Sequence, residues 1–183
     1  MPSLHKHTPI FFVGFMGAGK STVGRYVADI LGREFLDTDI LIENRFRKRI
    51  SDIFAEDGEA LFRRRETHMI QEICSFHNVV IATGGGLPCH SDNMALLNES
   101  GITVYLQHSN EELAHRLEQC KRTRPSIKEL SRDKLRHFIE DKMSVRQLIY
   151  EEAQMTINYK KDCPTNDEKQ LARLIVTRLQ ESA

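Results

Sequence analysis

The sequence predicts a three-layer α/β/α fold in which helices cover both faces of a five-stranded parallel sheet. Short apolar runs, typical of buried strands, alternate along the 183 residues with longer segments of helical periodicity. A glycine-rich loop follows the first apolar run directly, and a helical segment follows that loop. Strands and helices that alternate in this way build parallel sheets, because each crossover helix returns the chain to the same sheet edge.

The expected elements can be placed along the chain from apolar periodicity, capping residues and glycine breaks. Ser51 is the expected N-cap of the third helix, and Gly58 is expected to interrupt that helix before it continues. The expected strands lie at residues 10–13, 34–39, 78–82, 102–106 and 155–159. The other expected helices lie at residues 22–31, 40–48, 91–98, 110–119, 135–154 and 166–180.

The loop after the first strand matches G-x-x-x-x-G-K-[ST] from Gly14 to Ser21. Its glycines allow positive φ values, so the backbone N–H groups can turn inward around a phosphate at the start of a helix. Lys20 would supply charge to the β- and γ-phosphates, and the Ser21 hydroxyl would bind Mg²⁺. The sequence therefore predicts a P-loop for MgATP, with nucleotide contacts from Gly17, Ala18, Gly19, Lys20, Ser21 and Thr22.

Two acids end the second expected strand, Asp37 and Asp39. Residues two apart on a strand point to the same side, so both carboxylates would face the ligand edge of the sheet. The alternative is that Asp39 only caps the helix expected from residue 40. Beside a P-loop, we favour the interpretation that both acids are functional.

Two further segments predict contacts with a second substrate. Arg63 begins a run of three arginines, which span most of a helical turn and cannot share one face, so one is expected in a cleft and the others in solvent. Gly84, Gly85 and Gly86 directly follow a strand of buried type. Three glycines there favour close approach of a ligand to the backbone.

Residues 120–131 have the weakest secondary-structure pattern and carry a cluster of cations. Lys121, Arg122, Arg124 and Lys128 fall within this short window. A basic loop near a triphosphate site is typical of a lid that excludes water and supplies charge in the transition state. We expect one domain over residues 1–183, with a substrate segment at about 39–66 and a lid at about 120–131.

Composition excludes several other classes of protein. Lys plus Arg equals Asp plus Glu at 26 each, so the basic excess of a nucleic-acid binder is missing. No apolar run is long enough to span a membrane, and the N-terminus lacks the pattern of a signal peptide. The four scattered cysteines are expected to be reduced thiols in the cytoplasm. The eight histidines lack metal-ligand spacing, and a monomer is expected.

Several separated motifs together resemble the shikimate kinase family over residues 10–159. The P-loop alone indicates only a nucleotide, whereas the later motifs select the family. They are Phe35-Leu36-Asp37-Thr38-Asp39, Gly58-Glu59 with Phe62-Arg63 and Glu66, Gly84-Gly85-Gly86, Arg124-Pro125, and Arg146 with Tyr150-Glu151-Glu152-Ala153. The resemblance implies a fold similar to nucleoside monophosphate kinases. It also implies transfer of the ATP γ-phosphoryl group to the 3-hydroxyl of shikimate, a step of chorismate and aromatic amino acid biosynthesis.

The resemblance also implies roles for individual residues. Asp39 would hold the shikimate hydroxyls and accept or orient the 3-hydroxyl proton. Arg63 and Arg146 would bind the shikimate carboxylate, and Gly84, Gly85 and Gly86 would contact the ring. Asp37 would complete the Mg²⁺ shell, Arg124 would reach the transferred phosphoryl group from the lid, and Arg116 would stack on adenine, with Lys121 and Arg122 as alternatives.

Other functions remain open at this point. A gluconate kinase or a nucleotide kinase could share the fold, although a pair of arginines suits a carboxylate better than a base. A GTPase switch is disfavoured because the chain contains no N-K-x-D string. An ATP-binding module without catalysis is disfavoured because Lys20, Ser21, Asp39 and Arg124 are all present.

Overall fold

The computed structural model describes residues 8–121 and 127–181, and it contains a five-stranded, entirely parallel sheet. The strand order is β2-β3-β1-β4-β5, so β1 is central and β2 is an edge strand. The strands are β1 (Ile10–Val13), β2 (Glu34–Asp37), β3 (Val79–Ala82), β4 (Ile102–Gln107) and β5 (Met155–Asn158). The expected fold class and strand number are therefore confirmed.

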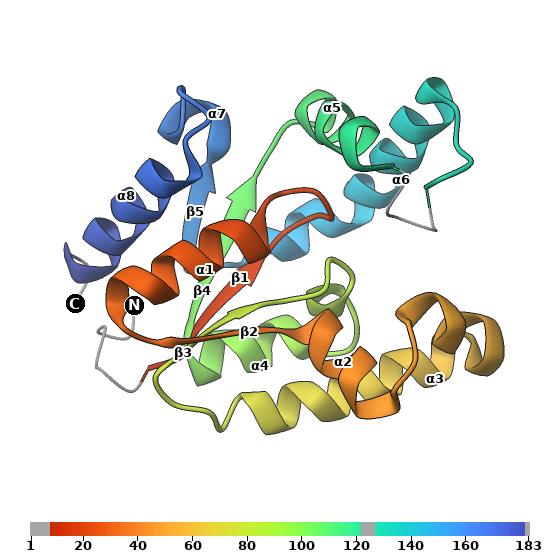
Figure 1. Cartoon of the computed structure of the whole chain (residues 1–183), viewed down its shortest axis with the longest axis horizontal. Helices are drawn as coiled ribbons and strands as arrows, with labels where there is room; N and C mark the ends of the chain where they lie inside the picture. Colours follow the sequence, from red (N-terminus) through yellow and green to blue (C-terminus); the bar gives the residue numbers. More distant parts are fainter. Residues whose placement is uncertain (1–7, 122–126, 182–183) are drawn as a thin grey trace.

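Helices cover both faces of the sheet (Figure 1). On one face, α1 (Lys20–Leu31) packs along the C-terminal helix α8 (Glu168–Glu181); α3 (Ile50–Ile73) and α4 (Asn93–Ser100) lie on the other face. The remaining helices are α2 (Thr38–Phe46), the 3-10 helix η1 (Leu87–Cys89), α5 (Asn110–Cys120), α6 (Arg132–Tyr150) and α7 (Tyr159–Asp162). Among the described residues, no helix has both the length and the apolar character needed to cross a membrane.

The central strands are buried on both faces, as parallel strands between helical layers must be. All four residues of β1 and all four of β3 are buried, which explains why both read as unbroken apolar runs. Strand β5 instead alternates between buried and exposed residues. Below the P-loop, Tyr105 of β4 packs against Tyr150 of α6 with ring centroids 5.3 Å apart. The site at the carboxyl edge is thus built on a closely packed centre.

The structure corrects the boundary between β2 and α2. The strand ends at Asp37, because the Asp37 carboxylate accepts a hydrogen bond from the Asp39 N–H at 3.0 Å and caps α2. Asp39 therefore lies in the first turn of a helix and does not share a strand face with Asp37. The alternative cap was also wrong, since Asp37, not Asp39, is the N-cap residue.

The expected cap of the third helix is wrong as well. Helix α3 starts at Ile50, one residue before Ser51, and the Ile50 N–H donates to the Glu43 carboxylate at 3.0 Å. A side chain from α2 therefore binds the first N–H of the helix, and Arg49 is the N-cap residue. The interruption at Gly58 is confirmed, with φ 75° and ψ 166° inside the helix.

Other boundaries differ from those expected from sequence by a few residues. Helix α6 begins at Arg132, where Ser131 accepts from the Lys134 N–H, and it ends at Tyr150, four residues before the expected end. Two short elements escaped prediction, η1 and α7, because three or four residues carry too little periodicity to be read. The Asn158 side chain caps α7 and stops β5.

The packing of α8 against α1 yields a stability prediction. Ile175 is completely buried in α8, whereas Ile30 of α1 is 47% exposed. Ile175→Ala should lower the free energy of unfolding by about 3 kcal/mol, because it leaves a cavity in the core. Ile30→Ala, which removes the same atoms from a half-exposed site, should cost less than about 1 kcal/mol. Urea unfolding of both variants measures the difference, and equal losses would contradict this account of the packing.

Candidate active site

The P-loop lines a cleft of about 480 Å³ at the carboxyl edge of the sheet. Gly14, Gly17 and Gly19 have φ values of 134°, 82° and 89°, which is the conformation expected of them. Lys20 is buried, and its Nζ donates to the carbonyl oxygens of Gly14 at 2.7 Å and Phe15 at 2.8 Å. The loop therefore holds the lysine charge beside the N-terminus of α1, where an anion is favoured.

Ser21 and Asp37, the two predicted metal ligands, are in contact. The Ser21 hydroxyl donates to Asp37 Oδ2 at 2.6 Å, and both residues line the P-loop cleft. The donor set consists of one hydroxyl and one carboxylate, which are hard oxygen ligands that fit Mg²⁺. No cluster of three or more His, Cys, Asp or Glu side chains suitable for a metal occurs among the described residues. A magnesium ion here would take its other ligands from phosphate and water.

A second cleft of about 780 Å³ lies beside the first, between α3 and α6. Arg63 of α3 and Arg146 of α6 line it together with the loop at 84–86 that follows β3. The structure thus brings together every predicted substrate-binding residue from four separate parts of the chain. They are Asp39, Arg63, Gly84, Gly85, Gly86 and Arg146.

Asp39 lies where the two clefts meet. Three residues line both cavities, namely Met16, Asp39 and Gly85. The glycine at position 84 is required for this arrangement, because a Cβ atom there would lie 2.5 Å from Asp39 Oδ1. The Gly84 N–H donates to the buried Thr38 hydroxyl at 2.8 Å, which fixes this loop against the first turn of α2.

Two carboxylates orient the Arg63 guanidinium inside the second cleft. Nη1 donates to Glu66 at 2.5 Å, and Nη2 donates to Glu59 at 3.0 Å. The guanidinium also lies over the rings of Phe54 and Phe62, at 5.6 and 5.2 Å from their centroids. Burial lowers the pKa of Arg63, but the two carboxylates outweigh it and raise the pKa overall. The guanidinium is therefore charged and held in one orientation.

Arg146 lies over Phe15 of the P-loop, with its guanidinium carbon 5.9 Å from the ring centroid. One turn further along α6, the buried Tyr150 hydroxyl donates to the Gly85 carbonyl at 2.5 Å. Burial raises the pKa of Tyr150, so the phenol stays protonated and remains a donor. Helix α6 thus contacts both the P-loop and the glycine loop, and its position links the two clefts.

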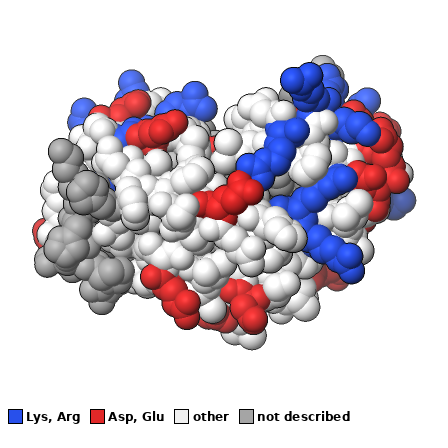
Figure 2. Space-filling view, turned by 90° about the horizontal axis from the view of Figure 1, so that it is seen from below, with Lys and Arg blue, Asp and Glu red and all other residues white. Residues whose placement is uncertain are grey.

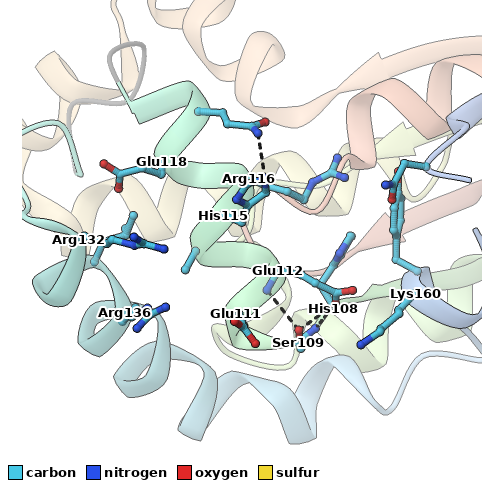
Figure 3. A pocket seen from close by; sticks show the side chains of 15 residues that line it. His108, Ser109, Glu111, Glu112, His115, Arg116, Glu118, Arg132, Arg136 and Lys160 are labelled. Atoms are coloured by element: carbon cyan, nitrogen blue, oxygen red, sulfur yellow. Dashed lines mark hydrogen bonds between the residues drawn. The ribbon is translucent and has the colours of Figure 1, made fainter. Parts of the chain in front are cut away.

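A third cavity, of about 960 Å³, lies between α5 and α6 and continues from the P-loop cleft, because Arg116 and Gln119 line both (Figure 3). Arg116 Nε donates to the Gly17 carbonyl at 2.8 Å, and its guanidinium lies over Tyr159 at 4.9 Å from the ring centroid. Among the candidates for contact with adenine, the structure places Arg116 against the P-loop. Arg122 and Arg124 lie outside the described residues.

The other arginines of the triplet behave differently from one another. Arg64 is exposed, as expected. Arg65 pairs with Asp57 at 2.5 Å and lies 4.2 Å from the centroid of Phe46, so it stabilises the bend of α3 instead of pointing into solvent. The sequence expectation of one arginine in a cleft holds for Arg63, and that of solvated partners holds only for Arg64.

Several residues that line the second cleft were not among the predicted site residues, Glu66 and Lys142 among them. Glu66 appeared only as part of a motif, although it is 2% exposed and binds Arg63. Lys142 lines the second cleft one helical turn before Arg146. The i, i+4 spacing of two cations on α6 was visible in the sequence and could have indicated a shared face.

Charge is unevenly distributed over the surface despite the overall balance. Figure 2 shows a group of Lys and Arg side chains at the end of the molecule where α3 and α6 lie in Figure 1, with Asp and Glu side chains beside them. Arg49, Arg63, Lys142 and Arg146 line the second cleft on these elements and just before α3. The same cleft is also lined by four acids, Asp39, Glu43, Glu59 and Glu66, so its cations are balanced by carboxylates.

The burial of Glu66 yields a prediction for stability against pH. Burial raises the pKa of Glu66 from 4.5 to about 7, although Arg63 acts in the opposite direction. The folded protein therefore binds this proton more tightly than the unfolded chain, so the group stabilises the fold fully below pH 4.5. That contribution is lost as the pH rises through about 7.

Glu66→Gln should remove this dependence. The free energy of unfolding of the original protein minus that of Glu66→Gln should fall by up to about 3 kcal/mol as the pH rises from 4.5 to about 8. Denaturant unfolding at a series of pH values measures it. Glu59→Gln is the control, because hydrogen bonding to Arg63 lowers the Glu59 pKa and gives the opposite sign. A difference that does not vary with pH would refute this assignment.

Comparisons with known proteins agree with this geometry. Residues 16–180 match the family described as "Shikimate kinase". The shikimate kinase of Parabacteroides distasonis is 48% identical over 158 residues, which cover 86% of this chain and 91% of that protein.

Solved structures give the same result. The crystal structure of shikimate kinase from Bacteroides thetaiotaomicron superposes with a TM-score of 0.86 at 40% identity, covering 96% of this chain and 97% of that one. The shikimate kinase of Acinetobacter baumannii in complex with shikimate has a TM-score of 0.84 at 36% identity, covering 96% and 94%. With a P-loop, a second cleft and matches over nearly its whole length, the chain belongs to the shikimate kinase family.

Proposed function

We propose that the chain transfers the γ-phosphoryl group of ATP to the 3-hydroxyl of shikimate, which yields shikimate 3-phosphate for chorismate biosynthesis. The position of Asp39 carries this proposal. Its carboxylate lies at the junction of the phosphate cleft and the second cleft, so a group bound on each side would meet there. Phosphoryl transfer depends mainly on such positioning and on charge stabilisation.

The second cleft suits a small hydroxylated carboxylate. Arg63 and Arg146 present two guanidinium groups on facing elements, and a guanidinium can bind a carboxylate through two parallel hydrogen bonds. Asp39 lines the same cleft, and its carboxylate can accept hydrogen bonds from hydroxyl groups. The backbone of Gly84, Gly85 and Gly86 also lines this cleft.

The P-loop cleft suits a nucleotide triphosphate with its metal ion. Lys20 would exchange its bonds to the loop carbonyls for the β- and γ-phosphates, and the N–H groups of residues 17–22 would bind the remaining oxygens. Ser21 and Asp37 would hold Mg²⁺ directly or through water. When bound, the ion neutralises the charge that develops on the transferred group.

The third cavity suits the nucleoside part of ATP. It is continuous with the phosphate cleft at Arg116 and Gln119, and the Arg116 guanidinium is already oriented by Gly17 and Tyr159. A planar guanidinium can stack on a purine. We place the lid at about 120–131, with Arg124 supplying charge to the transferred phosphoryl group.

Asp39 would orient the attacking hydroxyl and accept its proton as the new phosphate ester bond forms. The bond between the β,γ-bridging oxygen and the γ-phosphorus breaks, and ADP leaves with that electron pair. We further propose that the chain acts as a monomeric single domain in the cytoplasm, on a small molecule and without nucleic acid.

The substrate can be tested by coupled ADP release with MgATP, comparing shikimate, gluconate and AMP as acceptors. Shikimate alone should stimulate release, because only it combines a carboxylate for the two arginines with a ring that fits the glycine loop. Lys20→Ala is the blank. Phosphorylation of gluconate or AMP but not of shikimate would show that the acceptor is a different molecule. ATP binding without phosphorylation of any of the three would favour an ATP-binding module without catalysis.

Asp39→Asn tests the mechanism. The amide has the size of the carboxylate but cannot accept the proton, so kcat should fall by about 100-fold or more while the KM for shikimate changes less. Steady-state kinetics with both substrates measure the two parameters, and thermal unfolding verifies that the variant is folded. A kcat close to that of the original protein would show that Asp39 has no catalytic role.

A further inference from the structure

A buried histidine outside the predicted site contacts the back of the P-loop. His108 directly follows β4 and precedes Ser109, the N-cap of α5. Ser109 and Glu112 form a capping box, with the Glu112 N–H donating to the Ser109 hydroxyl and the Ser109 N–H donating to Glu112 Oε2. The backbone at His108 is therefore held between a strand and a well-capped helix (Figure 3).

The His108 imidazole forms a hydrogen bond from Nε2 to the Ala18 carbonyl oxygen at 3.0 Å. A carbonyl can only accept, so the hydrogen is on Nε2. His108 is 6% exposed, and burial lowers its pKa to about 4, so the ring is neutral. Its Nδ1 has no hydrogen-bond partner among the described residues. The ring thus has one tautomer and one bonded partner.

The Ala18 carbonyl belongs to the same peptide unit as the Gly19 N–H. The described chain has no cis peptide bond, so these two groups point in opposite directions across a planar unit. Because His108 holds the carbonyl, the Gly19 N–H is directed away from the histidine. Gly19 lines the phosphate cleft and adopts φ 89°.

Neighbouring side chains fix the imidazole plane. The His108 ring stacks on Tyr159 with centroids 4.4 Å apart and planes inclined by 27°. Arg116 also contacts the Tyr159 ring and donates to the Gly17 carbonyl at 2.8 Å. Two successive carbonyls of the loop are therefore held from one side, by Arg116 and by His108.

We propose that His108 is a positioning residue for phosphoryl transfer, which orients the Gly19 N–H toward the nucleotide phosphates by holding the Ala18 carbonyl. This inference rests on the proposed function, since it assumes that the P-loop binds ATP. His108 contacts no reacting atom, and its effect should appear in nucleotide binding and not in the binding of shikimate.

The decisive comparison is between His108→Phe and His108→Gln. Phenylalanine keeps the stack on Tyr159 but removes the donor, whereas the glutamine amide nitrogen can occupy the place of Nε2. His108→Phe should weaken MgADP binding by about 3- to 10-fold, the effect of one hydrogen bond. His108→Gln should recover affinity to within about 2-fold, and the Kd for shikimate should stay constant in both. His137→Phe, the same change at an exposed histidine of α6, is the matched control.

The outcomes separate this inference from the proposed function. If the original protein binds no MgADP, the proposed function fails; if it binds and His108→Phe binds equally well, the role of His108 fails. Equal losses in the Phe and Gln variants would also overturn it, because packing alone would then explain them. Should the Phe variant not fold, ¹⁵N spectra of the histidines in the original protein decide: the Nε2–H tautomer is required at His108, and the Nδ1–H tautomer refutes the proposal.

Discussion

One carboxylate, that of Asp37, connects two helices that carry different parts of the site. One of its oxygens accepts from Ser21 at the start of α1, and the other accepts from the Asp39 N–H at the start of α2. The helix that follows the P-loop and the helix that carries Asp39 therefore share one acceptor. Since Asp39 lines both cavities, this pair of bonds links the phosphate cleft to the second cleft.

In the second cleft, neighbouring groups orient the Arg63 side chain before any anion binds. Arg63 is held by Glu66 and Glu59 and by two aromatic rings. Such support lowers the entropy lost when a ligand binds, because the guanidinium is already oriented. This arrangement buries the carboxyl group of Glu66, and burial raises its pKa.

Sequence reasoning predicted the parts of the site whose chemistry is local. The P-loop follows from the spacing of three glycines, a lysine and a serine, and its glycines have the expected φ values. The strand order could be known only from the structure. The same holds for the position of Arg63, Arg146 and the glycine loop in one cleft, which lies at the sheet edge expected from the sequence. The roles assigned to these residues stay predictions, as does the lid, because Arg124 lies outside the described residues.

Sequence could not predict contacts that depend on which helix lies beside which. The sequence allowed Asp37 and Asp39 to end a strand together, and it also allowed Asp39 to cap a helix. The structure shows neither, because the Asp39 N–H donates to the Asp37 carboxylate and Asp37 is the cap. At the N-terminus of α3, Glu43 accepts from the Ile50 N–H, a contact between two helices that no local pattern encodes. The eight histidines lack metal-ligand spacing in the sequence, and His108 is distinguished by its hydrogen bond to the Ala18 carbonyl of the P-loop.

The strand order has a consequence for how the two halves of the site can respond to ligands. The P-loop extends from β1, which is paired with a neighbour on both sides, whereas Asp37 ends β2, which is paired only with β3. The nucleotide half is therefore anchored in the middle of the sheet, and the half formed by α2 and α3 is attached to its border. Adjustment of the acceptor side can occur by a small rotation of that border, while the register of the central strands is preserved.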